Sequence, residues 1–192
     1  ALAPRDKIVG AFEDIASNNL HLEQRDLLCI EGLYNEPLYA LNEVAVQRLG
    51  ASMISIDATI DNNPVATYNS DGVIISTPTG STAYSMSCGG PIISPNSRCL
   101  CITPISPHNL TLRPLVIPDD SVIRFVVNDS RKGVSLHFDS QTYPLQTPIS
   151  IEISRADMEL RLIRMQNQTF FSAIRNKLMW GTNLRQRKSN DE

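Results

Sequence analysis

The chain has 192 residues, 42% of them hydrophobic, which is enough for one globular domain with a sizeable core. Its formal net charge is −3, so it lacks the overall positive charge that attracts nucleic acids or anionic membranes, and we expect neither as a partner. Its apolar runs fall far short of the ~20 residues of a membrane-spanning helix, and its first residues do not resemble a signal peptide.

The first predicted element is a helix over residues 4–17. Pro4 suits its first turn, and Asn18-Asn19 suits its exit. Apolar side chains recur along it at helical spacing, which places them on one face. These positions are Ile8, Ala11, Phe12 and Ile15.

After this helix the apolar residues recur with a period of two, which is typical of strands with one buried face. The alternating segments are 53–58, 134–138 and 149–154. Turn-forming residues separate the strands at 61–64, 95–97, 118–120 and 128–130. Many short strands with this spacing predict a mainly β domain of the sandwich or barrel type.

One region departs from the β pattern. Residues 72–77 predict a buried strand, 78–81 a loop, and 82–88 a short helix closed by Gly89-Gly90. A further helix is predicted at 170–178. We see no internal repeat or linker, so we expect one domain over residues 1–182, followed by a flexible basic and polar tail over 183–192.

Hydroxyl side chains gather at the predicted strand-to-helix junction, in the run Thr-Pro-Thr-Gly-Ser-Thr-Ala-Tyr-Ser-Met-Ser at 77–87. Backbone N–H groups at a helix start are unpaired, and hydroxyls both donate and accept, so this loop can contact a heteroaromatic edge or a ribose. Gly80 lets the backbone pass close to a ligand, and Tyr84 offers an aromatic face with a polar tip. The plainer alternative is that Ser81 or Thr82 caps a helix.

A second polar group, Asn42-Glu43, precedes the apolar, strand-like run 44–46. An Asn amide matches the donors and acceptors of an adenine edge, and a carboxylate can accept from both hydroxyls of a ribose. A turn at the edge of a strand is the alternative. Asp71 stands before the predicted buried strand, and the spacing leaves open whether it contacts a ligand or belongs to an ordinary Asp-Gly turn.

The remaining candidates do not form a nucleophile–base pair or a metal site. His108 lies in the run Pro107-His108-Asn109-Leu110, near Arg113-Pro114, and a lone His of this kind is more often structural. The four cysteines, Cys29, Cys88, Cys99 and Cys101, fit neither a zinc knuckle nor a disulfide scaffold. We expect them as reduced, packed thiols of a cytoplasmic protein, and no set of ligands suggests a metal site built by this chain alone.

Residues 71–85 closely resemble the signature loop of the NAD kinase family, and Gly89-Gly90-Pro91 continue it in register. Asn42-Glu43 resembles the family's upstream Asn-Glu pair, and the segment 107–114 resembles its Pro-His…Arg-Pro segment. The resemblance runs from Glu23 through Gly181, with several motifs in the same order.

The resemblance implies a β-sandwich-like carboxy-terminal domain of an enzyme that phosphorylates the 2′-hydroxyl of the adenosine ribose of NAD, giving NADP. The donor in the family is ATP with a divalent metal, Mg²⁺, or polyphosphate in some members. Family members form homodimers or homotetramers, with sites that borrow residues from a neighbouring subunit. The implied contacts to the adenosine half are Asn42, Glu43, Thr79, Thr82, Ala83 and Tyr84, and those near the nicotinamide half are Asp71, Ser87 and Ser106.

Two departures from the family pattern shape the prediction. The Gly-Gly-Asp-Gly-Thr motif of the family's amino-terminal domain, which supplies the Asp assigned as base, does not occur in this chain. We therefore expect a fragment without a catalytic residue of its own, in which Asp71 orients a ligand. The run Phe138-Asp139-Ser140-Gln141 also stands where the family has Asp-Gly-Gln, which leaves the local turn open.

The alternative function is a stand-alone nucleotide-binding regulatory module without catalysis. A related lipid or diacylglycerol kinase domain fits poorly, because the hydroxyl-rich loop is not an apolar substrate pocket.

Overall fold

The structure, a computed structural model, describes residues 8–17, 21–128, 133–164 and 169–181. The chain divides into two compact units, residues 24–160 and residues 1–23 with 161–192, and each is described by itself.

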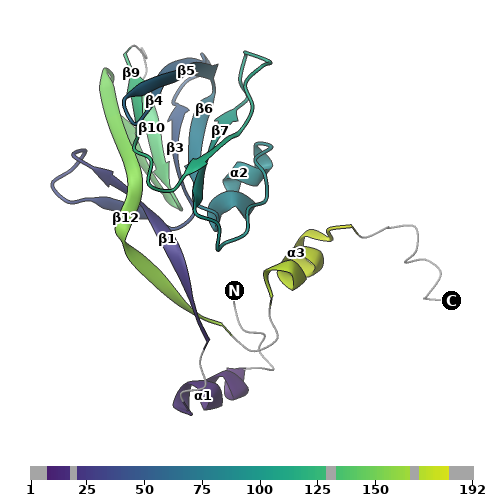
Figure 1. Cartoon of the computed structure of the whole chain (residues 1–192). Helices are drawn as coiled ribbons and strands as arrows, with labels where there is room; N and C mark the ends of the chain where they lie inside the picture. The colour runs from purple at the N-terminus through teal and green to yellow at the C-terminus, as the bar shows by residue number, and fades with distance from the viewer. Residues whose placement is uncertain (1–7, 18–20, 129–132, 165–168, 182–192) are drawn as a thin grey trace. The chain divides into compact units, whose positions relative to one another are not determined.

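The unit of residues 24–160 is built from two six-stranded sheets (Figure 1). The first has the strand order β2-β1-β12-β9-β4-β5, and the second has the order β11-β10-β3-β6-β7-β8. The strands are β1 (His21–Glu31), β2 (Leu38–Ala40), β3 (Glu43–Arg48), β4 (Ile54–Ile60), β5 (Asn63–Ser70), β6 (Gly72–Ser76), β7 (Cys99–Ile105), β8 (Leu115–Pro118), β9 (Ile123–Val127), β10 (Val134–Phe138), β11 (Gln141–Leu145) and β12 (Ile149–Arg164). The prediction of a mainly β, sandwich-like fold is confirmed.

The inner faces of the two sheets share one hydrophobic core. Alternation decides which side chains enter it: along β4, Ile54, Ile56 and Ala58 are buried while the residues between them are exposed. The largest fully buried side chains come from both sheets, among them Phe125 of the first and Leu136 of the second. Burial of such side chains supplies most of the stabilisation of a fold of this size.

The predicted strands lie where the alternation places them, with different ends. The strand predicted at 134–138 is β10 itself, the one predicted at 53–58 is β4, and the one predicted at 149–154 continues to Arg164. The predicted turns at 95–97 and 118–120 are confirmed by backbone hydrogen bonds from Ser97 to Ser94 and from Ser121 to Pro118. The turn predicted at 61–64 is shorter, since Ile60 pairs with Asn63, and most of 128–130 lies outside the described residues.

Strand β6 differs from the others because all five of its residues are buried. One of its faces joins the core between the sheets, and the opposite face forms a second, smaller cluster of Ala45, Ile74 and Ile105. Tyr84 and Cys88 pack on that second cluster. The hydroxyl-rich loop therefore continues from β6 onto the outer face of the second sheet, where helix α2 (Tyr84–Ser87) lies.

The other unit contains the helices α1 (Ile8–Ala16) and α3 (Phe170–Leu178). Both predicted helices are confirmed within the described residues; residues 4–7, the exit at Asn18-Asn19 and the tail 183–192 lie outside them. Helix α3 begins with a capping box between Thr169 and Ser172. The predicted apolar face of α1 is not buried, since Phe12 is 67% exposed.

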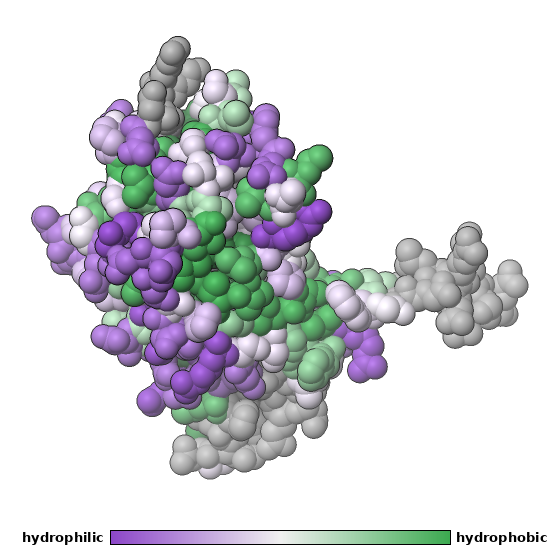
Figure 2. Space-filling view, turned by 45° about the horizontal axis from the view of Figure 1, so that its top comes forward, coloured by the Kyte–Doolittle hydropathy of each residue, from purple (hydrophilic) through white to green (hydrophobic). Residues whose placement is uncertain are grey.

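Exposed hydrophobic side chains are not confined to the helices. Figure 2 shows a continuous hydrophobic area bordered by hydrophilic side chains on one face of the molecule. Among the described residues, no helix is long and apolar enough to cross a membrane.

Candidate functional site

The hydroxyls of the loop that follows β6 fall into two sets. Thr77, Ser81 and Ser85 are fully buried. Thr79, Thr82, Ala83 and Tyr84 are half-buried, and Ser87 is exposed. The residues predicted as ligand contacts are therefore those that keep contact with solvent, and the buried set holds the loop in place.

The buried hydroxyls bond within the protein. Ser81 donates to the carbonyl of Pro78 (2.7 Å) and accepts from the backbone N–H of Ile93 (3.0 Å). The Ser85 and Thr103 hydroxyls lie 2.9 Å apart and share a hydrogen bond. Satisfied buried polar groups of this kind make a loop rigid, because breaking any one of them leaves a buried group unpaired.

The alternative that Ser81 or Thr82 caps a helix is wrong. Neither the 3₁₀ turn Gly80–Thr82 nor α2 has a side-chain cap, and the residue at the N-cap of α2 is Ala83. Ser81 cannot serve as a cap because Pro78 and Ile93 already occupy its hydroxyl.

The loop packs directly on the segment 41–43. The Thr77 backbone N–H donates to the carbonyl of Asn42 (2.9 Å), and the Thr77 hydroxyl donates to the carbonyl of Leu41 (2.7 Å). The same hydroxyl accepts from the Gly80 N–H (3.1 Å). The backbone of Asn42 thereby lies against Gly80, in the loop that also carries Thr79 and Thr82.

Asp139 holds the same segment from the other side. Its carboxylate accepts backbone hydrogen bonds from Leu41 (2.8 Å), Asn42 (2.7 Å) and Glu43 (3.3 Å). Residues 41 and 42 form a bend and β3 begins at Glu43, as the alternative of a turn at a strand edge predicts, and Asp139 holds the backbone of this bend. The sequence left the turn at Asp139 open, and reasoning from sequence missed this contact because the residues are 96 to 98 positions apart.

The Glu43 carboxyl is the most perturbed acid of the site. Burial and the negative charge of Asp139 raise its pKa to about 7, and a hydrogen bond from the backbone of Tyr84 acts in the opposite direction. One of its oxygens is buried and has no hydrogen-bond partner in the protein. Such an oxygen is available to a ligand hydroxyl, and a pKa near neutrality lets the group exist in both protonation states.

Asp71 and Ser106 lie at the other end of β6. Gln47 pairs with Gly72 and Glu43 pairs with Ser76, so four residue steps, about 13 Å at ~3.3 Å each, separate the two ends. The Asp71 N–H donates to the carbonyl of Ile105 (3.0 Å), which brings Asp71 close to Ser106. The predicted site residues therefore form two groups.

Tyr84 connects the two groups. Its backbone bonds to Glu43, and the charge of Asp71 is among the causes that raise the pKa of its phenol, after burial and Cys88. The Asp71 carboxylate is itself paired with the Arg48 guanidinium at 2.6 Å. Asp71 thus occupies the turn between β5 and β6 that the Asp-Gly alternative predicts, and its carboxylate is partly exposed. Its contact with a ligand stays a prediction.

Two histidines have different surroundings. The His108 side chain is exposed, and its backbone N–H donates to the carbonyl of Asn69 (2.9 Å). The structural role predicted for its side chain stays a prediction. His137 was not singled out from the sequence. It pairs with Ala45 of β3, and alternation along β10 directs its side chain to the sheet face opposite that of Leu136. Its ring nitrogens bond to the hydroxyls of Ser135 (2.8 Å) and Thr142 (3.0 Å), and burial lowers its pKa.

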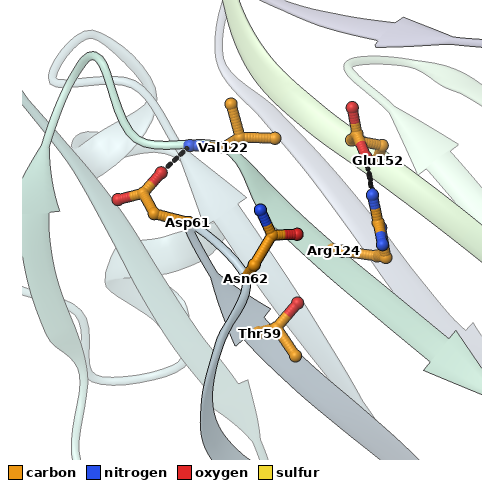
Figure 3. Close-up of a pocket in the computed structure, with 6 residues that line it drawn as sticks. All are labelled: Thr59, Asp61, Asn62, Val122, Arg124 and Glu152. Carbon is orange, nitrogen blue, oxygen red and sulfur yellow. Dashed lines mark hydrogen bonds and ion pairs between the residues drawn. The ribbon is translucent and has the colours of Figure 1, made fainter.

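A surface cavity of about 340 Å³ lies on the first sheet, away from all of these residues (Figure 3). It is lined by Thr59, Asp61, Asn62, Val122, Arg124 and Glu152. Arg124 and Glu152 form an ion pair at 2.6 Å, and the Asp61 carboxylate accepts the backbone N–H of Val122. Within the part of the chain that the structure describes, no three His, Cys, Asp or Glu side chains are grouped as metal ligands, and the four cysteines are free.

The sequence matches a known protein family. Residues 41–165 match the family described as the ATP-NAD kinase C-terminal domain. An NAD kinase of Cytophaga hutchinsonii is 34% identical over 189 residues, and one of Flavobacterium johnsoniae is 41% identical over 194 residues. Each comparison covers 96% of this chain but only 65% of the relative, so the chain spans about two thirds of the curated relatives it matches.

The fold has close counterparts among solved structures. Yeast NADH kinase, crystallised with NADH, superposes with a TM-score of 0.85 at 25% identity, over 93% of this chain and 55% of that one. An NAD kinase of Archaeoglobus fulgidus, crystallised with ATP, superposes with a TM-score of 0.77 at 22% identity, over 90% of this chain and 67% of that one. The two-sheet fold is thus the fold of these kinases.

Proposed function

Because the chain belongs to the NAD kinase family, we propose that it supplies the NAD-binding site of an enzyme that phosphorylates the 2′-hydroxyl of the adenosine ribose of NAD to give NADP. Its relatives are longer, so the phosphoryl donor, ATP or polyphosphate, meets this site from the part of the enzyme that the chain does not cover. Yeast NADH kinase, the structural relative crystallised with NADH, supports a nicotinamide dinucleotide as the ligand.

The observation that carries the proposal is the division of the loop hydroxyls. Thr77 and Ser81 are buried and bonded to backbone groups, whereas Thr79 and Thr82 remain partly open beside Asn42. A site held in one conformation before the ligand arrives loses little entropy on binding. We assign the adenosine half of NAD to Asn42, Glu43, Thr79, Thr82, Ala83 and Tyr84.

Glu43 is proposed to bind ribose hydroxyls. Its buried oxygen without a protein partner can accept from a hydroxyl, and doing so favours the ionised carboxylate. Binding then lowers a pKa that lies at about 7 in the free protein, so NAD affinity should rise as the pH increases through 7. Proton release during binding, measured by calorimetry in buffers of different ionisation enthalpy, checks this assignment.

The nicotinamide half is assigned to Asp71, Ser87 and Ser106. These residues lie toward the far end of β6 or on the exposed end of α2, away from Asn42. An extended dinucleotide needs two groups of contacts set well apart, and Tyr84 lies between them. Asp71 is proposed to orient the ligand and not to act as the general base, since Arg48 already pairs with its carboxylate.

The chemical step depends on groups outside this chain. Phosphoryl transfer is catalysed by positioning and by stabilising charge on the phosphates. The described residues group no set of metal ligands, and we propose that Mg²⁺ binds with the donor, in the part of the enzyme that the chain does not cover. We further propose a cytoplasmic enzyme that assembles as a homodimer or homotetramer.

The test is a calorimetric titration of this chain with NAD and NADP, followed by an assay of a fusion. In the fusion, the chain is joined to the part of the Flavobacterium johnsoniae NAD kinase that it does not cover. We expect saturable NAD binding by the chain and NADP formation by the fusion. Binding without NADP formation would instead favour a nucleotide-binding regulatory module, and the absence of binding in both proteins contradicts the proposal.

A further inference from the structure

Asp139 occupies a two-residue turn between β10 and β11, since Phe138 pairs with Gln141. Its φ is 49°, in the left-handed region that few residues other than Gly adopt, although Asp and Asn are enriched there. This conformation turns the carboxylate toward the neighbouring strand β3, where it accepts the backbone N–H groups of Leu41, Asn42 and Glu43.

Every backbone N–H and carbonyl group of residues 41–43 has a hydrogen-bond partner. Asp139 accepts all three N–H groups, and its own N–H donates to the carbonyl of Glu43 (3.1 Å). Thr77 donates to the other two carbonyls, those of Leu41 and Asn42. Hydrogen bonds to an ionised acceptor are shorter and stronger than neutral ones. These bonds therefore fix the backbone of residues 41–43 and the directions in which its side chains point.

We propose that Asp139 is a positioning residue for the acceptor nucleotide. It contacts no substrate itself but fixes the backbone of residues 41–43, so that Asn42 and Glu43 meet the adenosine half in one geometry. This inference rests on the proposed function, because Asn42 and Glu43 are the residues assigned there to adenosine.

The chemistry of the side chain explains why an aspartate stands at this position. Three converging N–H donors need two acceptor oxygens, and an ionised carboxylate is the side-chain group that offers acceptors alone. An asparagine would keep one oxygen for Asn42 and Glu43 but would turn an N–H₂ toward the N–H of Leu41. The charge also acts on Glu43, whose carboxyl is faced by Asp139 from this turn and by the Tyr84 backbone from α2.

The chain contains a matched control for Asp139. Asp61 also has a φ of 49°, also occupies a two-residue turn, and also accepts a backbone N–H from a neighbouring segment, that of Val122 at 2.8 Å (Figure 3). Its own N–H donates to the carbonyl of Val122 (2.9 Å), just as that of Asp139 donates to Glu43. Asp61 lies on the other sheet, away from the proposed site.

The experiment compares Asp139→Ala, Asp139→Asn and Asp61→Ala in this chain. Three quantities are measured: NAD affinity by calorimetry, the melting temperature, and hydrogen exchange at the amides of residues 41–43. We expect Asp139→Ala to lower NAD affinity at least about tenfold and to accelerate exchange at these three amides. We expect Asp61→Ala to lower the melting temperature by less, since its carboxylate accepts one N–H and not three, and to leave both other quantities unchanged.

The conservative variant separates geometry from charge. We expect Asp139→Asn to retain part of the NAD affinity, because one acceptor oxygen remains. We also expect the Glu43 carboxyl to titrate at a lower pH in this variant, since a negative neighbour is gone. A ¹³C NMR titration of the Glu43 carboxyl measures this effect of charge separately from the geometric effect on NAD affinity.

The inference and the proposed function fail in different ways. The role of Asp139 is overturned if Asp139→Ala leaves hydrogen exchange at residues 41–43 unchanged. It is also overturned if this variant binds NAD as tightly as the unmodified chain does. The role of Asp139 is also overturned if both alanine variants lose NAD affinity in proportion to the decrease in their melting temperatures. If neither the unmodified chain nor the fusion binds NAD, the proposed function is wrong, and Asp139 then has no nucleotide to position.

Discussion

The backbone of Gly80 lies so close to Asn42 that a Cβ on this glycine would stand 1.9 Å from the Asn42 carbonyl oxygen. The neighbouring Gly80 N–H bonds to the hydroxyl of Thr77, which itself binds the carbonyl of Leu41. The absence of a side chain at residue 80 is thus what allows the hydroxyl-rich loop to pack on the segment 41–43.

Gly80→Ala is therefore expected to destabilise the chain. The added methyl group meets backbone atoms that cannot rotate away, and overpacking of this kind costs about 1–3 kcal/mol or more. Urea denaturation measures the loss. The matched control is Gly10→Ala in helix α1, where a Cβ meets nothing within 4 Å and where alanine favours the helix, so this variant should be neutral or slightly stabilising. Equal stability of the two variants would show that the loop can move aside.

Thr82→Val is expected to weaken NAD binding by about 1–2 kcal/mol, because a ligand group would lose its hydrogen-bond partner in a half-buried site. Within the protein, the Thr82 hydroxyl makes only a long contact to the carbonyl of Thr79 (3.4 Å), so the fold should tolerate the change. Calorimetry measures the affinity. As a control, Thr67→Val removes an exposed hydroxyl bonded to Asp57 and should leave the affinity unchanged. Equal affinities for both variants would remove Thr82 from the site.

Glu43→Gln tests the perturbed acid through the pH dependence of stability. The pKa of Glu43 is raised from 4.5 to about 7, so the folded chain retains a proton that the unfolded chain has released between these values. The contribution of this group to stability is therefore fully present below pH 4.5 and is lost as the pH rises through 7. We expect Glu43→Gln to lack this decline and to gain stability relative to the unmodified chain as the pH rises to 8. Parallel stability curves for the two proteins would contradict the raised pKa.

Asp71→Asn tests whether this residue orients the ligand or acts as the base. The variant is made in the fusion with the remaining part of the Flavobacterium johnsoniae enzyme. An asparagine oxygen can still accept from Arg48, so we expect a higher KM for NAD with measurable kcat. Complete loss of kcat with an unchanged affinity for NAD would assign Asp71 to the chemical step instead.

The sequence predicted this fold because its signals are local. Strict alternation in 134–138 identifies β10, the continuous apolar run in 72–76 identifies a strand buried on both faces, and helical spacing identifies α1. The candidate site was predicted from several motifs that occur in the same order as in the NAD kinase family. All of them lie on or beside the second sheet.

Three features of the site needed the strand pairing. The Asp139 carboxylate meets the backbone of Leu41 across 98 residues because β10 pairs with β3. The Arg48–Asp71 ion pair follows from the pairing of β3 with β6. The division of the loop into buried and open hydroxyls depends on the sheet surface beneath it, and Thr77 and Thr79 look alike in the sequence.

For this protein, the amino-acid sequence by itself determined the element types, the family resemblance and the residue types available to a dinucleotide. The tertiary structure determined which hydroxyls remain open, which carboxyl is perturbed and which residue holds the Asn-Glu segment. The physical reason is that periodicity and turn preferences act within a few residues, whereas burial, charge and hydrogen bonding at the site depend on how two sheets pair and pack over a common core.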